Sequence, residues 1–237
     1  MRVALLQSNY LPWKGYFDII GRVDIFVFHD DVQYTKGDWR NRNLIKTPQG
    51  PQWLTVPCGT SEKRLICEVE LGKSEWQAKH WDRIRQNYAH APFFTEYRDY
   101  LEDFFLGVVW RNLSEMNRHF ISRVAHDFLG FTTALDDSRN YDLTLTKADR
   151  VLELLLKVGA TTYVSGPAAK TYLSGDRLAA HGIDVEWMDY ESYPQYPQLY
   201  PPFDHRVSIL DLLFSVGACA PDFVCGHKPL TRRTGKS

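Results

Sequence analysis

The chain lacks several signals that mark common protein classes. It has no excess of positive charge, because 28 Lys and Arg residues face 29 Asp and Glu residues and the net charge is −1. Proteins that bind nucleic acids or membranes by charge carry a basic excess, so we expect no DNA and no membrane partner. No apolar run approaches the roughly 20 residues of a membrane span, and no secretory signal opens the sequence. These absences favour a cytoplasmic protein.

Cysteine patterns and common catalytic motifs are also missing. The four cysteines form no C-x-x-C pair and match no standard zinc spacing, which is typical of free thiols in a reducing compartment. The motifs G-x-S-x-G and H-E-x-x-H do not occur. The sequence therefore predicts no metal site, and nothing in it points to a covalent acyl-enzyme.

Short apolar runs that alternate with helical patterns are present, and they predict an α/β fold. Residues 2–7 and 24–29 are typical of buried strands, with a helix between them that Pro12 can open. A single crossover helix makes two such strands parallel neighbours. The turn "PQGP" predicts a hairpin over 43–58, and residues 65–71 are predicted as one more strand.

The middle of the chain changes to helical periodicity, and the alternating pattern then returns. Three amphipathic helices are predicted over 74–90, 96–112 and 113–130. We expect an α/β fold whose parallel or mixed sheet has flanking helices, Rossmann-like or nucleotidylyltransferase-like, with a three-helix insertion. The expected parts of this single domain (1–237) are an N-terminal α/β half with the hairpin (1–72), the helical insertion (73–130), a C-terminal α/β half (131–220) and a mobile basic tail (228–237).

Polar residues follow the predicted strands, at the edge where an open parallel sheet binds its ligands. Helices that begin at Pro12 and Pro167 would add backbone N–H donors suited to an anion. A small Ser-Gly turn precedes the second of these helices, and this geometry can hold a phosphate. The polar clusters expected to meet at one edge are 8–10, 30–43, 136–138, 165–166 and the loop that starts at Glu191.

The stretch "DDVQYTKGDWRNRN", from Asp30 to Asn43, is the densest of these clusters. Its three acidic residues balance its three basic residues. Arg40 and Arg42 could hold a pyrophosphate with two hydrogen bonds each, or they could pair with the aspartates. Trp39 could stack on a base or cover the core. The sequence leaves the choice between a ligand pocket and a salt-bridged scaffold open.

Several blocks of the sequence resemble one known family. "QSNYLPWKGYFDII", "DIFVFHDDVQYTKGDWRNRN", "WLTVP", "YVSGPAAKTYL" and "SILDLLFSVG" together resemble the WbqC-like family over nearly the whole chain. The resemblance implies a role in O-antigen or related surface-polysaccharide synthesis, with transfer of an aminoacyl group, notably glycyl, to a nucleotide-linked amino sugar. The first block also looks like the entry of nucleotidylyltransferase folds, but it lacks their P-x-H-x-G-H histidines. That departure puts adenylate chemistry in doubt.

The leading hypothesis is thus an N-acyltransferase acting on a dTDP- or UDP-linked amino sugar. The amine must lose a proton to a base, and the acyl carbonyl needs hydrogen-bond donors. The candidate catalytic residues for these two tasks are Asp30, Asp31, His29, Asn9 and Gln33. The candidate residues for binding the nucleotide and the substrates are Gln7, Tyr10, Lys14, Lys36, Trp39, Arg40, Asn41, Arg42, Ser165, Gly166, Lys170 and Tyr196.

The acyl donor stays open in this hypothesis. The amino acid could be activated by ATP with magnesium, or it could arrive as an aminoacyl-tRNA or a thioester; no other cofactor is indicated. Two alternative functions also remain. One is an ATP-dependent adenylyl or nucleotidylyl transferase, and the other is a non-catalytic module that binds a sugar nucleotide.

Overall fold

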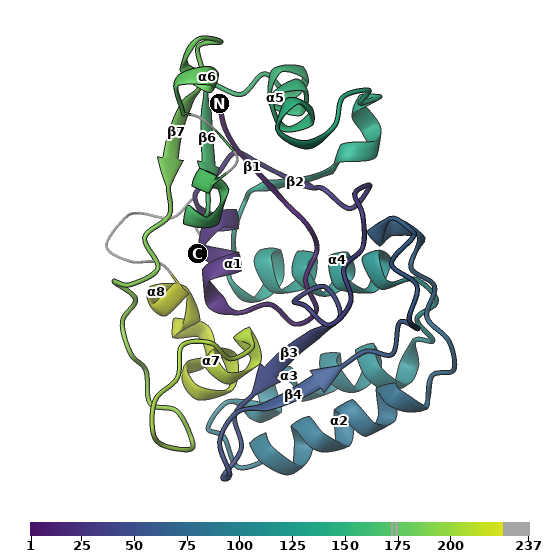
Figure 1. Cartoon of the computed structure of the whole chain (residues 1–237). Coiled ribbons are helices and arrows are strands. Elements are labelled where there is room, and N and C mark those ends of the chain that lie inside the picture. The colour runs from purple at the N-terminus through teal and green to yellow at the C-terminus, as the bar shows by residue number, and fades with distance from the viewer. Residues whose placement is uncertain (172, 174, 225–237) are drawn as a thin grey trace.

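A parallel sheet forms the centre of the fold, as the strand predictions imply. The computed structural model describes residues 1–171, 173 and 175–224, and within these residues the sheet has five strands (Figure 1). They are β1 (Arg2–Leu6), β2 (Ile25–Phe28), β5 (Ala134–Asp137), β6 (Thr162–Ser165) and β7 (Asp184–Trp187). The predicted tail 228–237 lies outside the described residues.

The order of the strands is β5-β2-β1-β6-β7, and each pair of neighbours is parallel. The chain moves outward from β1 through β2 to β5, then crosses back to β6 on the other side of β1. The direction of winding therefore reverses between β1 and β6. In open α/β sheets this reversal opens a crevice at the carboxyl ends of the strands, where ligands bind.

Alternating side chains of the strands pack into two separate apolar clusters. Val3 and Leu5 of β1 pack with α5 (Lys147–Val158) and α6 (Gly175–Ala179) on one face. Ala4, between them, faces the larger core that contains α1 (Lys14–Gly21). Because period-two alternation places successive side chains on opposite faces, the sheet is covered on both faces.

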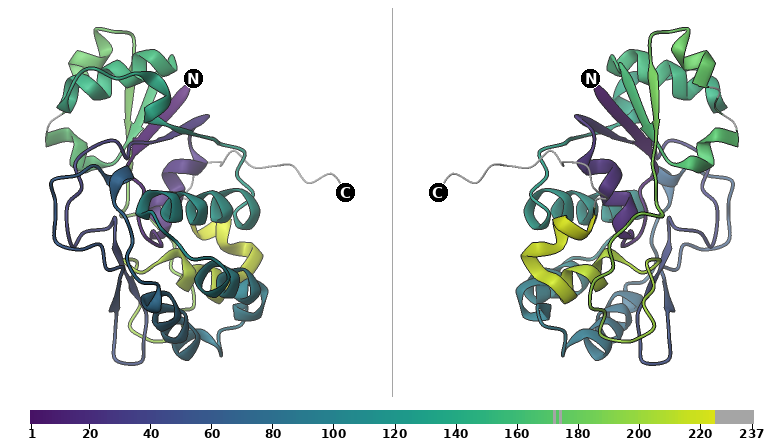
Figure 2. Two further views of the ribbon diagram at one scale, coloured as in Figure 1. Left: turned by 90° about the vertical axis from the view of Figure 1, so that its right-hand side faces the viewer. Right: turned by 90° about the vertical axis from the view of Figure 1, so that its left-hand side faces the viewer.

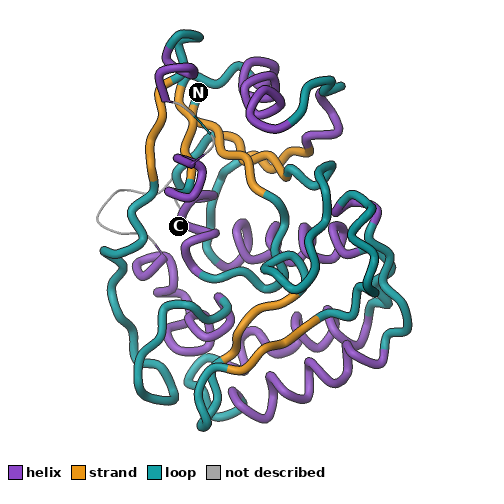
Figure 3. The backbone as a smooth tube through the Cα atoms, in the orientation of Figure 1, coloured by secondary structure: helices purple, strands orange, loops and turns teal. Residues whose placement is uncertain are grey.

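The predicted hairpin is confirmed as a separate antiparallel pair (Figure 3). It consists of β3 (Arg42–Ile45) and β4 (Gln52–Thr55), with Leu44 opposite Trp53. Ile45 and Leu54 are buried, whereas Trp53 is 42% exposed. One face of the hairpin therefore packs on the core and the other is open.

The predicted helical insertion consists of α2 (Glu75–Tyr88), α3 (Phe94–Glu102) and α4 (Leu113–Arg123). The side chain of Asn112 caps α4 by accepting a hydrogen bond of 3.0 Å from the Glu115 amide, as expected for this residue at a helix start. The chain continues as π-helical turns after α3 (Asp103–Gly107) and after α4 (Val124–Phe128). Figure 1 shows these helices beside the hairpin, below the parallel sheet.

Two local predictions are wrong. Residues 65–71 form no strand but a 3₁₀ turn, Ile66–Glu68, because their amides bond to carbonyls of separate segments: Ile66 to Val32 and Leu71 to Arg111. Pro12 does not open the first helix, since α1 begins at Lys14. The short helix predicted to begin at Pro167 does begin there, as a 3₁₀ segment, Pro167–Thr171.

A long irregular segment, residues 188–208, joins β7 to α7 (Ile209–Val216), and we call it the strap. Figure 2 shows it running along one side of the molecule from the sheet to the lower helices. No helix among the described residues has the length and apolar character needed to cross a bilayer. The remaining short elements are 3₁₀ segments at Ser138–Tyr141 and Gly217–Cys219 and the final helix α8 (Ala220–Val224).

Candidate functional site

A pocket of about 210 Å³ opens beside the loop that follows β1, where the winding of the sheet reverses. Two of the side chains that line it, Asn9 and Trp39, were predicted from the sequence. The others were missed, because they come from the start of α1, from the hairpin and from the strap. The lining residues are Asn9, Trp13, Trp39, Asn43 and Arg206.

The loop after β1 is held in an unusual shape by the hairpin. Leu11 has a φ of +43°, a left-handed conformation that is costly for a branched side chain and is often found at functional sites. The Asn43 amide donates to the carbonyls of Tyr10 at 3.1 Å and Leu11 at 2.9 Å. Asn43 therefore fixes the loop, and its own amide is not available for a ligand.

Asn9 is the free donor of this pocket. Neither its backbone N–H nor its side-chain amide forms a hydrogen bond with another residue in the described part of the chain. The next amide in the loop, that of Tyr10, is occupied by the carbonyl of Trp39 at 2.9 Å. Asn9 thus fits its predicted role as a donor to a ligand oxygen.

Aromatic rings and a positive charge extend the pocket along the open face of the hairpin. The rings of Trp39 and Trp53 lie 5.5 Å apart, and both side chains are more than 40% exposed. The guanidinium of Arg42 lies 4.2 Å from the centre of the Trp53 ring. Within 1–171, 173 and 175–224 no carboxylate pairs with Arg42, and its Nε is buried without an acceptor. Its charge is available to an anion.

Arg40 has the opposite environment. Its guanidinium pairs with Asp38 at 2.8 Å and also donates to the side chain of Gln7, while its carbonyl accepts from Asn117 at 2.8 Å. Arg40 and Asp38 therefore neutralise each other, as the charge balance of the sequence allows. Arg42 has no such partner among the described residues. Arg40 and Gln7 connect the end of β1 to the 30–43 stretch.

Asp30 is fully buried, which removes it from the candidate bases. Its two carboxylate oxygens accept hydrogen bonds from the Ser8 amide at 2.7 Å and from the Ser114 hydroxyl. Burial raises the pKa of Asp30, although these hydrogen bonds and the charge of Arg118 oppose the rise. Asp30 therefore ties the ends of β1 and β2 to the start of α4 and has no free face for a substrate.

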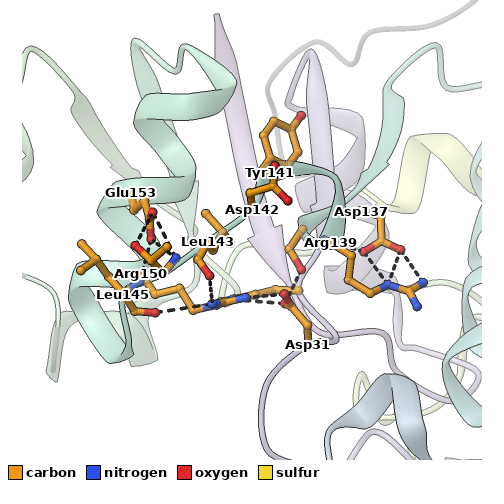
Figure 4. Close-up of polar contacts among 12 residues, drawn as sticks. Asp31, Asp137, Arg139, Tyr141, Asp142, Leu143, Leu145, Arg150 and Glu153 are labelled. Carbon is orange, nitrogen blue, oxygen red and sulfur yellow. Dashed lines mark hydrogen bonds and ion pairs between the residues drawn. The ribbon is translucent and has the colours of Figure 1, made fainter.

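Asp31 lies nearer the surface, in a cluster with groups from three other elements (Figure 4). Its carboxylate accepts from Ser138 and pairs with Arg150 of α5. Arg150 also donates from Nε to His29 Nε2 at 3.2 Å. Burial lowers the pKa of His29; the Asp31 carboxylate opposes this and the Arg150 charge adds to it. His29 is thus held neutral, with its Nε2 lone pair engaged by Arg150.

A second ionic cluster follows β5, one strand further along the same edge. Arg118 of α4 and Arg139 both pair with the Asp137 carboxylate (Figure 4 shows the Arg139 contact). Burial by itself would raise the pKa of Asp137, but the hydrogen bonds from Arg139 and the charge of Arg118 outweigh it and lower the pKa. The predicted meeting of polar strand ends is therefore observed at β1, β2 and β5.

Other predicted binding residues do not reach the pocket. Tyr10 is buried, and its hydroxyl bonds to His80 at 2.7 Å. Asn41 is buried and donates to the Val56 carbonyl at 2.9 Å, so it holds the hairpin. Tyr196 belongs to the strap, and its side chain is buried. Lys14 is buried too and donates to the Pro194 carbonyl at 2.9 Å, so it offers no charge to a phosphate.

The remaining predicted residues lie elsewhere on the surface or on the strand edge. Gln33 lines a separate shallow hollow with Glu62 and Arg64. The amide of Lys36 is bonded to Glu62 at 2.7 Å. Ser165 is buried at the end of β6, and the Lys170 ammonium lies 5.3 Å from the Trp187 ring. Gly166 is approached by Tyr190, whose hydroxyl would lie 3.1 Å from an added Cβ.

No group of three or more His, Cys, Asp and Glu side chains in the described ranges is placed to hold a metal ion.

The sequence model of the WbqC-like protein family matches residues 7–222. A curated relative from Mycobacterium tuberculosis (strain ATCC 25618 / H37Rv), "Uncharacterized protein Rv1507c", is 44% identical over 225 residues, which cover 94% of this chain and 97% of the relative. No solved structure matches the chain.

Proposed function

The chain belongs to the WbqC-like protein family, and from this premise we propose that it is an N-acyltransferase. Its substrate would be a nucleotide-linked amino sugar, with dTDP or UDP as the carrier, in O-antigen or related surface-polysaccharide synthesis. The group transferred to the sugar amine would be an aminoacyl group such as glycyl.

One observation carries the proposal: among the described residues, a cation without a counter-charge lies beside a pair of exposed tryptophans, one of which, Trp39, lines the pocket. Arg42 makes no ion pair within the described residues and stacks on Trp53, whose ring neighbours Trp39. A guanidinium binds phosphate oxygens with two parallel hydrogen bonds, and a tryptophan face stacks on a base or a sugar ring. A ligand that joins a ring to a diphosphate satisfies both groups at once.

The chemistry needs a base and a hydrogen-bond donor at the same edge of the sheet. The amine nitrogen attacks the acyl carbonyl carbon, its proton passes to a base, and the leaving group departs with the electron pair of the broken bond. Asp31 is the better-placed base, because its side chain is 15% exposed whereas Asp30 is fully buried. Its contacts with Ser138 and Arg150 orient the carboxylate and leave it further lone pairs for a proton. Asn9 offers free donors for the developing oxyanion. The leaving group is adenylate, a thiol or a tRNA oxygen, depending on the donor.

Mass spectrometry of a dTDP- or UDP-linked amino sugar incubated with glycine and ATP, with and without the protein, tests this proposal. The expected product has gained one glycyl group on the sugar amine. Pyrophosphate release without that gain would favour an adenylyl or nucleotidylyl transferase, and saturable binding with neither product would favour a binding module. Charged glycyl-tRNA and a glycyl thioester should replace glycine with ATP in parallel reactions, so that the donor is not assumed.

A further inference from the structure

Lys14, the first residue of α1, is enclosed by the strap. Only 2% of its surface is exposed. Its ammonium donates to the Pro194 carbonyl at 2.9 Å and lies 5.0 Å from the centre of the Tyr193 ring and 5.2 Å from that of Tyr196. A desolvated cation over two tyrosine faces is strongly attracted to them. A single side chain therefore contacts three residues of the strap.

The same part of the strap supports one wall of the pocket. Trp13, which lines the pocket, packs edge-on against Tyr190 at 5.2 Å and Tyr193 at 5.8 Å. Further along the strap, Arg206 lines the pocket directly. Lys14 follows Trp13 in the chain, so it anchors the strap directly behind this wall.

The charged groups around Lys14 come from three elements. Asp18, one turn along α1, attracts the ammonium but is already paired with Arg22 at 2.6 Å and accepts from the Tyr193 hydroxyl at 2.8 Å. On the strap, the Lys14 charge together with burial lowers the pKa of His205. From α7, the Asp211 carboxylate reaches Tyr196 rather than Lys14.

We infer that Lys14 is a positioning residue: it holds the strap against Trp13 and so forms the wall and the Arg206 corner of the ligand pocket. The inference about ligand affinity rests on the proposed function. Burial lowers the pKa of Lys14 to about 8, with Asp18 opposing the change. A pKa below that of a solvated lysine means that the closed strap favours the neutral amine, which can still donate to the Pro194 carbonyl, so the wall should tighten as the pH rises through this value.

The titratable strap residues beside Lys14 do not titrate in that range. The pKa of His205 lies below its ordinary 6.5, and burial raises the pKa values of Tyr193 and Tyr196 further above 10. A change in the strap centred near pH 8 therefore reports on Lys14.

Hydrogen–deuterium exchange of the unliganded protein tests the anchoring without any assumption about function. Lys14→Met should speed exchange in strap peptides covering 190–196 by about tenfold, because it leaves the Pro194 carbonyl without its donor and removes the contacts with both rings. Tyr200→Phe is the matched control: it removes another strap hydrogen bond, from the Tyr200 hydroxyl to the Asn87 carbonyl at 2.8 Å, and should leave 190–196 unchanged. Equal exchange in wild type and Lys14→Met would overturn the inference, whatever the ligand is.

Binding of uridine diphosphate and thymidine diphosphate, measured by calorimetry, tests the effect on the pocket. Wild-type affinity should rise about tenfold between roughly pH 7 and pH 9, while Lys14→Arg, which stays charged, should show no such rise. A rise of the same size in Lys14→Arg would assign the effect to another group and overturn the inference. If the wild type binds neither nucleotide, the proposed function fails, and the exchange experiment still decides whether Lys14 anchors the strap.

If Lys14→Met does not fold, the wild-type protein supplies the same test. Its exchange in 190–196, corrected for the intrinsic effect of pH on amide exchange, should fall as the pH rises through about 8, relative to a core peptide of β1. A constant ratio of the two peptides would contradict the inference.

Discussion

Arg150 and Asp31 form an ion pair across the carboxyl edge of the sheet, 119 positions apart in the chain, with each side chain only 15% exposed. A pair shielded to this degree holds its geometry better than one on the open surface. Through it, α5 sets the position of the carboxylate that we propose as the base.

Asp31→Asn should reduce acyl transfer by a factor of about 10²–10⁴, the usual contribution of a positioned base. The amide keeps the shape of the side chain, so nucleotide affinity should change little. Initial rates of product formation and calorimetry of the nucleoside diphosphate give the two quantities. Asp99→Asn on α3, whose side chain is 81% exposed, is the control, and full transfer activity in Asp31→Asn would exclude Asp31 as the base.

Arg42→Met should weaken binding of a nucleoside diphosphate by about 10- to 100-fold, because a hydrogen bond to a charged group contributes roughly 1.5–3 kcal/mol. Binding of the nucleoside without phosphates should be unaffected, since the charge contacts only the phosphates. Arg98→Met serves as the control: Arg98 is half exposed and pairs with Asp99 on α3. If both ligands lose affinity equally, Arg42 acts through the hairpin rather than on the phosphates.

The strands and the insertion helices could be predicted because the signals for each lie within its own short stretch of sequence. Apolar runs, the "PQGP" turn and the Asn112 cap all act within a few residues. Residues 65–71 also form a short apolar run, which by itself predicts a strand. Its apolar residues Ile66, Val69 and Leu71 are indeed buried. Their backbone amides, however, bond to segments that no local pattern reveals.

Only two of the five residues that line the pocket could be predicted, for a related reason. Asn9 and Trp39 follow from strand ends and from the dense polar stretch. Arg206 and the burial of Lys14 depend on where the strap lies, and the Lys14–Pro194 contact spans 180 positions. The pairing of Arg40 with Asp38, and the lack of a partner for Arg42 among the described residues, also depend on the three-dimensional arrangement of this stretch. Counting charges gives the net charge of this stretch, but it does not show which of its residues form ion pairs with each other.

Asp30 should prove to be a structural residue. Asp30→Asn can keep both hydrogen bonds, its oxygen accepting from the Ser8 amide and its nitrogen donating to the Ser114 oxygen, whereas Asp30→Ala leaves the buried Ser8 amide unpaired at a cost of about 1–3 kcal/mol. Urea denaturation of the three proteins measures these differences. Near-wild-type stability of Asp30→Ala would contradict the structural role.

The raised pKa of Asp30 determines the direction in which its contribution to the stability of the fold changes with pH. Because burial raises its folded pKa above 3.8, the folded chain binds more protons than the unfolded chain just above that pH, and its contribution to stability falls as pH rises through this window. Asp30→Asn lacks this titration. Its stability relative to wild type should therefore increase from about pH 4 towards neutrality.

His80 should make the protein sensitive to acid. Burial lowers its pKa from 6.5 to about 4, so its contribution to stability is complete above 6.5 and is lost as the pH falls towards 4. The full change corresponds to about 3 kcal/mol. His80→Gln, which can still accept from the Tyr10 hydroxyl, should show a smaller loss between about pH 6.5 and 4.5 in urea denaturation. Equal pH profiles for the two proteins would show that His80 is not responsible.

The placement of the strap has a consequence for biosynthesis. Asn9 and Trp13 are synthesised well before Arg206 and the strap residues that back the Trp13 wall. The pairing of β1 with β6 joins Arg2 to Thr162, and pairings this distant in sequence form slowly. A chain that stops before the strap therefore has the strand-end clusters of β1, β2, β5 and β6 but no closed pocket, so ligand binding reports that the strap has been made and has folded.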